Sequence, residues 1–369
     1  MGAAAALVDG EIVPGDVEVD PDDGTVSCVA VGGEAGMGIA VPGLVDLQVN
    51  GFSGVEFRWA DADGYGRAAE ALAAHGATAV QPTFFSCSVD DYRRALGVLA
   101  AVHRDPPHGS RFLGAHLEGP FLSPTWCGAH LVEFFLTPDP AALDGLLAAG
   151  PVSFMTVAPE LPRADDLVAQ LVAAGVTVSI GHTDAGAGRV RDAVDAGATH
   201  LTHCWNAHRR FAPRDPGPAG VALTDPRVTI GLIPDLVHVS GEVVQMTLAA
   251  APGRVAATTD AIPPAGSGLA SWEEHGRRVT VVDGAARLGD GTLAGSVATP
   301  DRILRNLVGL GLPLAAAVDA CGGAQRRLLG LPEVGLRPGD PADVVVLDDD
   351  LRPLRTVVAG REVWAAGAA

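Results

Sequence analysis

Short apolar runs alternate with longer helix-like segments through most of the chain, and this alternation constrains the fold more than any other feature. The runs are rich in Val, Ile, Leu and Phe and are short enough to be buried strands. Because parallel strands need crossover connections, repeated alternation predicts a parallel sheet. The expected strands are 44–49, 78–84, 112–117, 152–157, 176–180, 200–204, 228–233 and 255–259.

The intervening segments have the periodicity of amphipathic helices. Ala, Leu and Val recur on one face, with Arg, Asp and Glu on the other. About eight strand–helix units fit a (β/α)8 TIM-type barrel, in which active sites lie at the carboxyl ends of the strands. A doubly wound open sheet is the alternative, but no Gly-x-Gly-x-x-Gly follows a strand. The expected helices are 66–75, 90–101, 140–148, 164–174, 188–196 and 241–251.

Both ends of the chain differ from the middle, because they contain short β segments separated by Gly-rich and Pro-rich turns. Two β-rich ends that enclose an α/β middle predict one small β-sandwich domain assembled from both termini. We expect this domain to comprise residues 1–40 plus 338–369 and the barrel to comprise residues 41–337. The expected terminal strands are 6–8, 11–13, 17–19, 26–31, 342–347, 355–359 and 361–364.

The formal net charge of −19 excludes some partners. Nucleic-acid binding relies on basic surface that neutralises phosphates, so we expect no nucleic-acid partner. A small anionic substrate would need a local positive site, for which residues 208–214 (His-Arg-Arg-Phe-Ala-Pro-Arg) are the candidate; a solvated basic loop is the alternative. No apolar run approaches the roughly 20 residues of a membrane span, so no membrane association is expected.

The first residues lack the basic region of a signal peptide, and the five cysteines are scattered without a Cys-x-x-Cys. These features predict a cytoplasmic protein with reduced thiols. The sequence also contains no lysine. Schiff-base catalysis, a P-loop lysine and a carboxylated-lysine bridge between two metal ions are therefore excluded.

Polar or ionisable residues recur where the apolar strands end. Any one of them could be an ordinary solvated strand end, but together they would lie on one rim of a barrel. His182 and His203 are 21 positions apart, about the length of one strand–helix–strand step. The strand-end residues are Gln48, Asn50, Glu118, His182, His203 and Asp260.

The residue types at this rim indicate a metal site. One carboxylate (Glu118) and two imidazoles (His182 and His203) leave room for water, which is typical of catalytic metal sites. A bound divalent metal lowers the pKa of water toward about 7, and Asp260 is the candidate general base. We expect one metal ion per subunit because Gln48 and Asn50 are weak ligands. Zinc suits this ligand set, and so do iron, cobalt and manganese.

A set of short motifs, in order along nearly the whole chain, resembles the N-acetylglucosamine-6-phosphate deacetylase family of the amidohydrolase superfamily. Single motifs are weak signals, whereas the ordered set is highly specific. The motifs are PGLVD (42–46), QVNG (48–51), HLEGPFL (116–122), GAH (128–130), APE (158–160), GHT (181–183), TH (202–203), NA (206–207), RDPG (214–217), DLVH (235–238), TDA (259–261), GTLAGS (291–296) and GLRPGDPAD (335–343).

The resemblance implies roles for residues of this chain. Glu118, His182 and His203 would bind the metal, and Asp260 would be the catalytic base and acid. His130 would contact the substrate and polarise its acetyl carbonyl. The pair Gln48 and Asn50 matches family members with one metal, as residues beside the metal site or vestigial ligand positions. The substrate would contact Ala129, His130, Asn206, Ala207, Arg214, His238, Leu293, Ala294 and Gly295.

Four of these residues, Asn206, Ala207, Arg214 and His238, would hold the sugar phosphate. In related enzymes the equivalent of Arg214 reaches across a dimer interface, so the resemblance also implies a homodimer. The chain departs from the family pattern at Trp126, at Leu131 and at His208, three positions expected near the substrate. These departures bear on which amino sugar is used more than on the chemistry.

The resulting hypothesis is metal-dependent deacetylation of an N-acetyl amino-sugar 6-phosphate, with N-acetylglucosamine 6-phosphate as the first choice. A second hypothesis keeps the metal site but assigns another acylated amine or a cyclic amide as substrate, because one scaffold supports many such reactions. A third is a catalytically silent sugar-phosphate-binding protein. The joint presence of Glu118, His182, His203 and Asp260 argues against the third hypothesis.

Overall fold

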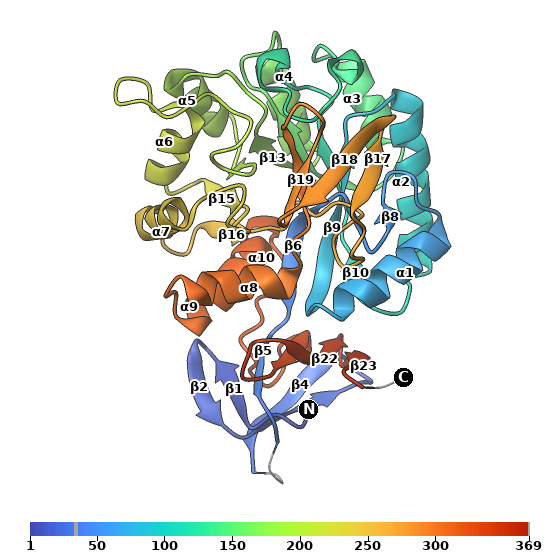
Figure 1. Ribbon diagram of the computed structural model, residues 1–369, viewed down its shortest axis with the longest axis vertical. Coiled ribbons are helices and arrows are strands. Elements are labelled where there is room, and N and C mark those ends of the chain that lie inside the picture. The colour runs from blue at the N-terminus through green and yellow to red at the C-terminus, as the bar shows by residue number, and fades with distance from the viewer. Residues whose placement is uncertain (33–35, 368–369) are drawn as a thin grey trace.

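The computed structural model describes residues 1–32 and 36–367. Figure 1 shows two parts stacked along the long axis, an α/β barrel and a smaller β part that contains both chain ends. This arrangement confirms the fold class predicted from the sequence. The domain boundaries at residues 40 and 338 stay a prediction, since the chain passes between the two parts through β5, Ile39–Pro42, a strand of the smaller part.

Eight parallel strands form the nearly closed barrel in the described part of the chain. Seven of them pair in sequence order, and β6 joins through β9. Each expected strand is present, with ends that differ by a few residues. The strands are β6 (Leu44–Val49), β9 (Ala77–Phe85), β11 (Ala115–Glu118), β12 (Val152–Val157), β13 (Thr177–Ile180), β14 (His200–Leu201), β15 (Thr229–Leu232) and β16 (Val255–Ala257).

The six expected helices surround this barrel, and several begin at capping residues. Asp61, Ser88 and Asp139 each accept a hydrogen bond from a backbone N–H of the first turn, which satisfies a donor that the helix itself cannot pair. Apolar faces of these helices pack on the outer surface of the strands. The helices are α1 (Ala62–Ala73), α2 (Val89–Arg104), α3 (Pro140–Leu147), α4 (Ala164–Ala173), α5 (Ala187–Asp195) and α7 (Gly241–Ala250).

The first and last barrel strands meet differently from the others. Among the described residues, β6 and β16 share no ladder, and the bridge between Val49 and Ala261 lies just beyond the end of β16. The backbone N–H groups of Asn50 and Gly51 donate to the Ala261 carbonyl at 2.8 and 3.1 Å. This seam brings the end of β6 next to the turn that carries Asp260.

The smaller part contains a six-stranded sheet in the order β2-β1-β5-β21-β22-β23, beside the hairpin β3–β4. Its core is small and aliphatic, with Val17, Val26 and Val344 buried together. Both termini supply strands, as the sequence predicts. The remaining bounds are β1 (Ala5–Val8), β2 (Glu11–Pro14), β3 (Asp16–Asp20), β4 (Thr25–Val31), β21 (Val344–Leu347), β22 (Pro353–Val358) and β23 (Arg361–Ala365).

A four-stranded antiparallel sheet between β16 and α8 was not predicted from the sequence. Its strands are short, and their alternating burial leaves polar residues on the outer face. Figure 1 shows this sheet beside the barrel strands, away from the smaller β part. Its strands are β17 (Ser271–Glu274), β18 (Arg277–Val282), β19 (Ala285–Arg287) and β20 (Leu293–Ser296).

Other short elements were also not predicted. They include helices near Pro and Gly residues, whose composition gives weak helical signals. Of the described residues, no helix is both long enough and apolar enough to span a bilayer. The elements are β7 (Gly51–Phe52), β8 (Val55–Glu56), β10 (Arg111–Phe112), α6 (Gly217–Thr224), α8 (Pro300–Gly309), α9 (Leu314–Val318), α10 (Ala324–Leu329) and the single turns Pro124–Trp126, Val132–Phe134 and Asp319–Gly323.

Candidate metal centre and active site

A cavity of about 280 Å³ lies at the carboxyl ends of the barrel strands. Most of the site residues predicted from the sequence line this cavity, although they lie far apart in the chain, from Asn50 to Gly295. Gln48 and Arg214 are the two predicted residues that do not line it. The predicted residues that line it are Asn50, Glu118, Ala129, His130, His182, His203, Asn206, Ala207, His238, Asp260, Leu293, Ala294 and Gly295.

Three donor atoms of this cavity surround one point. Oε1 of Glu118 lies 3.3 Å from Nε2 of His182 and 3.0 Å from Nε2 of His203, and the two nitrogens are 3.1 Å apart. Ligands held about 2.0–2.1 Å from a tetrahedral metal are separated by about 3.3–3.4 Å. The three distances therefore fit the ligand edges around one small cation.

Proton positions also favour a cation at this point. Nδ1 of His182 lies 2.9 Å from the backbone carbonyl of Trp126 and donates to it, so Nε2 of the neutral ring carries a lone pair. That lone pair faces a carboxylate oxygen and a second imidazole nitrogen. Such a carbonyl contact also fixes the ring orientation, as is usual for histidines that bind metals.

Glu118 is buried, and burial alone would raise the pKa of its carboxyl. The neighbouring imidazoles of His130, His182 and His203 outweigh that effect and hold the pKa of the Glu118 carboxyl well below its ordinary value. Glu118 is therefore a carboxylate at neutral pH, as a metal ligand must be.

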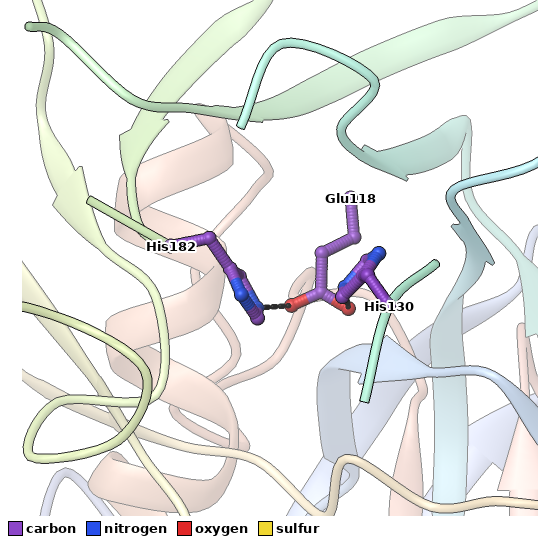
Figure 2. A group of neighbouring side chains, drawn as sticks. All are labelled: Glu118, His130 and His182. Carbon is purple, nitrogen blue, oxygen red and sulfur yellow. Dashed lines mark hydrogen bonds and ion pairs between the residues drawn. The ribbon is translucent and has the colours of Figure 1, made fainter. Parts of the chain in front are cut away.

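His130 is a second imidazole beside Glu118. Figure 2 shows Glu118 between His130 and His182, and the donor atoms of these three residues all lie within 4.8 Å of one another. Nε2 of His130 is 3.6 Å from Oε2 of Glu118, which is longer than a hydrogen bond. Two ligand sets are thus conceivable, but the tighter triangle of donor atoms is the one that includes His203.

The hydrogen bond to the His130 ring determines which of its two nitrogens carries the proton. The backbone N–H of Ser86 donates to Nδ1 at 3.3 Å, so the neutral ring carries its proton on Nε2. The ring stacks on Phe85, with centroids 3.5 Å apart. Burial lowers the pKa of His130 to about 3, helped by the nearby His182. His130 is therefore a neutral donor that faces the cavity.

Asp260 lines the same cavity. Its Oδ1 accepts a hydrogen bond of 2.8 Å from Nδ2 of Asn50. Burial raises the pKa of Asp260 to about 7, and the charge of Glu118 adds to the rise. A carboxyl with a pKa near neutrality can both accept and donate a proton at physiological pH.

Three of the chemically important residues have left-handed backbone conformations. The φ angles are +45° for His182, +28° for His203 and +50° for Asp260. Residues other than glycine rarely adopt such angles, and the strain costs about 1–3 kcal/mol each. Such strained conformations persist only where the surrounding structure enforces them, and they are common at functional sites.

Gln48 lies behind the cavity wall, where its Nε2 donates to Oε1 of Glu118 at 2.9 Å. Asn50 contacts Asp260 as described above. Each of the two residues thus contacts a different carboxylate of the cavity, and their role beside a metal stays a prediction.

The predicted phosphate-binding residues are only partly brought together. Asn206, Ala207 and His238 line the cavity, and Nδ1 of His238 is 2.7 Å from Oδ2 of Asp235. Arg214 is exposed and forms no ion pair with the described residues. The neighbouring Arg209 is not available as a positive site, because it pairs with Asp184 and Asp215.

The three departures from the family pattern have different surroundings. Trp126 lines the cavity, and its indole N–H donates to Asp184 at 2.8 Å. Leu131 and His208 are not among the lining residues. His208 instead accepts from the backbone N–H of Trp205 at 2.8 Å and holds its own loop. Of the three, Trp126 alone therefore lies on the wall of the cavity.

A buried charge cluster at the cavity wall was missed by the sequence reasoning. Arg58 is 1% exposed and pairs with Glu56 and with Glu274, which joins the unpredicted sheet to the barrel. Nη1 of Arg58 is also 2.7 Å from Nε2 of His275. The only signal in the sequence was the pattern Glu-Phe-Arg at 56–58, which is common on solvated surfaces.

The chain matches no family model. Its barrel is shared with enamidase of the amidohydrolase superfamily, at a TM-score of 0.58 and 14% identity over 98% of this chain and 94% of that one, which shows the fold alone. The human N-acetylglucosamine-6-phosphate deacetylase is 36% identical over 91% of this chain and 86% of the relative. The N-acetylgalactosamine-6-phosphate deacetylase of Escherichia coli O157:H7 is 32% identical over 88% and 86%.

Similarity to solved structures extends over almost the whole chain. A mutant N-acetyl-D-glucosamine-6-phosphate deacetylase from Mycobacterium smegmatis, in complex with N-acetyl-D-glucosamine-6-phosphate, superposes with a TM-score of 0.90 at 35% identity over 98% of this chain and 97% of that one. The fold and relatives define a hydrolase of amide bonds built on a TIM-type barrel. Within that class, the chain belongs to the N-acetylglucosamine-6-phosphate deacetylase family.

Proposed function

We propose that this protein hydrolyses the acetamide bond of an N-acetyl amino-sugar 6-phosphate, giving acetate and the amino-sugar 6-phosphate. The observation that carries the proposal is the convergence of Glu118, His182 and His203 on one point in the cavity that also contains Asp260. The names of the relatives supply the substrate class, with glucosamine and galactosamine forms both represented.

In this proposal Glu118, His182 and His203 hold one divalent metal ion, with zinc as the first choice and iron, cobalt and manganese as alternatives. The supporting observations are the 3.0–3.3 Å spacing of the donor atoms and the lone pair of His182 Nε2. A metal bound there would lower the pKa of a water ligand toward about 7 and polarise the acetyl carbonyl.

Asp260 moves the protons of the reaction. It accepts a proton from the attacking water as oxygen bonds to the acetyl carbon. It then donates that proton to the sugar nitrogen as the carbon–nitrogen bond breaks, so the amine leaves as a neutral group. Its buried position and its pKa of about 7 suit both steps.

His130 stabilises the negative charge that develops on the acetyl oxygen. Its neutral ring keeps Nε2–H for this purpose because Nδ1 accepts from Ser86. A fixed donor in a cavity with little water lowers the energy of such an oxyanion more than a donor in bulk water would.

The phosphate would lie at the end of the cavity formed by Asn206, Ala207 and His238. Arg214 is on the surface of its own subunit, so in this proposal it reaches the cavity of a second copy in a homodimer. Its exposure and the 52% exposure of nearby Phe211 support that arrangement. The five cysteines are free, which supports a cytoplasmic location.

An acetate-release assay tests the proposal. The substrates are the 6-phosphates of N-acetylglucosamine, N-acetylgalactosamine and N-acetylmannosamine together with their unphosphorylated forms, and the metal content is measured on the same sample. We expect about one metal ion per chain and a preference for a phosphorylated sugar. Metal without acetate release from any of these sugars would favour another acylated amine or a cyclic amide as substrate. If the sample contained no metal and hydrolysed none of the sugars, a silent binding protein would be favoured.

A further inference from the structure

Asp46 is a buried carboxylate of β6 that none of the proposed steps uses. It is 3% exposed, and it forms no ion pair with any described arginine or histidine. A buried charge without a counter-ion is costly unless several hydrogen bonds compensate for the lost hydration. The carboxylate of Asp46 receives such hydrogen bonds from two neighbouring segments of the chain.

Four donors surround the two oxygens of Asp46. The hydroxyl of Thr258 and the backbone N–H of Gln48 donate to Oδ1, the latter at 3.2 Å. The hydroxyl and backbone N–H of Thr259 donate to Oδ2 at 2.6 and 3.0 Å. The two backbone N–H groups can only donate, and the two hydroxyls also donate here, so the position favours a side chain with acceptors alone. An asparagine would direct its NH₂ at one of these donors.

The donors belong to the turn that carries Asp260. Thr258 and Thr259 directly precede it. Among the described residues β6 and β16 share no ladder, and the backbone holds this turn to β6 only at Ala261, beyond Asp260, through the bridge to Val49 and the N–H groups of Asn50 and Gly51. The turn is strained, because Asp260 has a φ of +50°. On its other side the N–H of Ser296 donates to the Asp260 carbonyl at 2.8 Å.

Residues of β6 and its end therefore contact both carboxylates of the site, Glu118 and Asp260. Along β6 and its end, Asp46 holds the Thr258–Thr259 segment, Gln48 contacts Glu118 and Asn50 contacts Asp260. These three positions are two residues apart. Movement of the turn relative to β6 would break the Asn50 contact and displace the Asp260 carboxylate.

We propose that Asp46 is a positioning residue for Asp260: its carboxylate clamps the strained Thr258–Ala261 turn to β6 and so fixes the proton-transferring group relative to the metal ligands. This inference rests on the proposed role of Asp260. Asp46 itself touches neither substrate nor metal. Because displacement of a reacting group by about 1 Å can cost about a hundredfold in rate, loss of the clamp lowers turnover more than substrate affinity.

The test compares Asp46→Asn with Asp343→Asn. Asp343 is 0% exposed and directly precedes β21, and its carboxylate pairs with Arg111 and, at 2.8 Å, with Arg326. It does not line the cavity, so it controls for the loss of a buried carboxylate. We expect Asp46→Asn to lower kcat per folded, metal-loaded molecule by at least about tenfold, with KM within about threefold of wild type. Asp343→Asn lowers the unfolding midpoint but leaves kcat within about twofold of wild type.

A milder pair covers the case in which Asp46→Asn does not fold. Thr259→Val removes one hydroxyl donor from the clamp. Thr356→Val removes a buried hydroxyl of β22 that donates to the Ala73 carbonyl of α1 at 2.7 Å, away from the cavity. We expect kcat to fall for Thr259→Val and to stay unchanged for Thr356→Val. Equal kcat values in all folded variants would overturn the proposal.

A crystal structure of Asp46→Asn, or of Thr259→Val where the first variant does not fold, separates this inference from the proposed function. We expect the Asp260 carboxylate to have left Asn50. An unchanged Asn50–Asp260 contact would overturn the positioning role whatever the substrate is. Wild-type protein that releases no acetate would instead contradict the proposed function, while the crystallographic comparison would still decide whether Asp46 holds the turn.

Discussion

Nε2 of Gln48 donates a hydrogen bond to Oε1 of Glu118 across 2.9 Å, and the same oxygen is the one that faces His182 and His203. The amide therefore fixes the rotation of the carboxylate about its last torsion. It also occupies a lone pair that would otherwise be free to accept a proton.

Replacement of Gln48 by Leu should therefore weaken metal binding. Removal of a partner that orients a ligand typically costs about 10–100-fold in metal affinity, and we expect a loss in this range. Competition with a chelator at several concentrations measures the dissociation constant. Gln81→Leu is the matched control, because Gln81 is also a buried barrel glutamine but bonds Ser153 at 2.7 Å. Equal metal affinity in both variants would contradict the orienting role.

Replacement of Asp260 by Asn should separate proton transfer from metal binding. The amide keeps the size of the carboxyl but neither accepts the proton of the water nor returns it. We expect the metal content to stay at the wild-type value and kcat to fall by about 10²–10⁴. Elemental analysis and an acetate-release assay on one sample provide both numbers. A variant that turns over at nearly the wild-type rate would rule out Asp260 as the base.

Arg214→Ala should act on phosphorylated substrates alone. If the guanidinium pairs with the sugar phosphate in a dimer, its loss raises KM for the 6-phosphate by about tenfold or more and leaves the unphosphorylated sugar unaffected. Arg210→Ala is the control, since Arg210 belongs to the same basic loop and also forms no ion pair with the described residues. An equal rise in KM for phosphorylated and unphosphorylated sugars would show that Arg214 does not bind the phosphate.

Glu56 should make stability depend on pH. Burial and the charge of Glu274 raise the pKa of Glu56 to about 7, despite the attraction of Arg58. The folded protein therefore retains a proton that the unfolded chain loses near pH 4.5. The stabilisation is complete below that pH and is lost as the pH rises through about 7. At about 1.4 kcal/mol per pKa unit, the loss is at most about 3 kcal/mol.

Denaturant unfolding at pH 5 and pH 8 measures this effect. We expect Glu56→Gln to show a smaller fall in unfolding free energy between the two values than wild type does. Glu273→Gln provides the control, because Glu273 is exposed on β17 beside Glu274. If Glu56→Gln and wild type lost stability equally between pH 5 and pH 8, the raised pKa would be wrong.

The barrel could be predicted from the sequence because buried parallel strands are nearly continuous apolar runs. Strands such as Val152–Val157 and helices that begin at Ser88 or Asp139 satisfy local rules and tertiary packing at once. The β17–β20 sheet could not be found in this way. Ser271–Glu274 has the polar composition of a loop, whereas Val-Thr-Val-Val at 279–282 is a strand signal that the prediction did not use.

Within the site, the side chains that end strands were predictable, since the fold places all such ends on one rim. Contacts made by backbone atoms could not be predicted from the sequence. The hydrogen bond from His182 to the Trp126 carbonyl is an example. Asp46 was also missed as a site residue, because its importance depends on a seam between two strands about 210 residues apart. His208 was expected near the substrate together with Asn206 and Ala207, but those two residues line the cavity and His208 does not.

The ion pairs of Arg58 and the contact of Arg277 with the Ala129 carbonyl fasten the β17–β20 sheet to the barrel from two sides. The sheet contributes Trp272, Val279 and Leu293 to the cavity but none of Glu118, His182, His203 and Asp260. The reacting side chains and part of the cavity wall therefore come from separate stretches of the chain. Within such an architecture, exchange of residues 271–292, which spares Ser296 and its hydrogen bond to the Asp260 carbonyl, would reshape the cavity and leave the reacting groups in place.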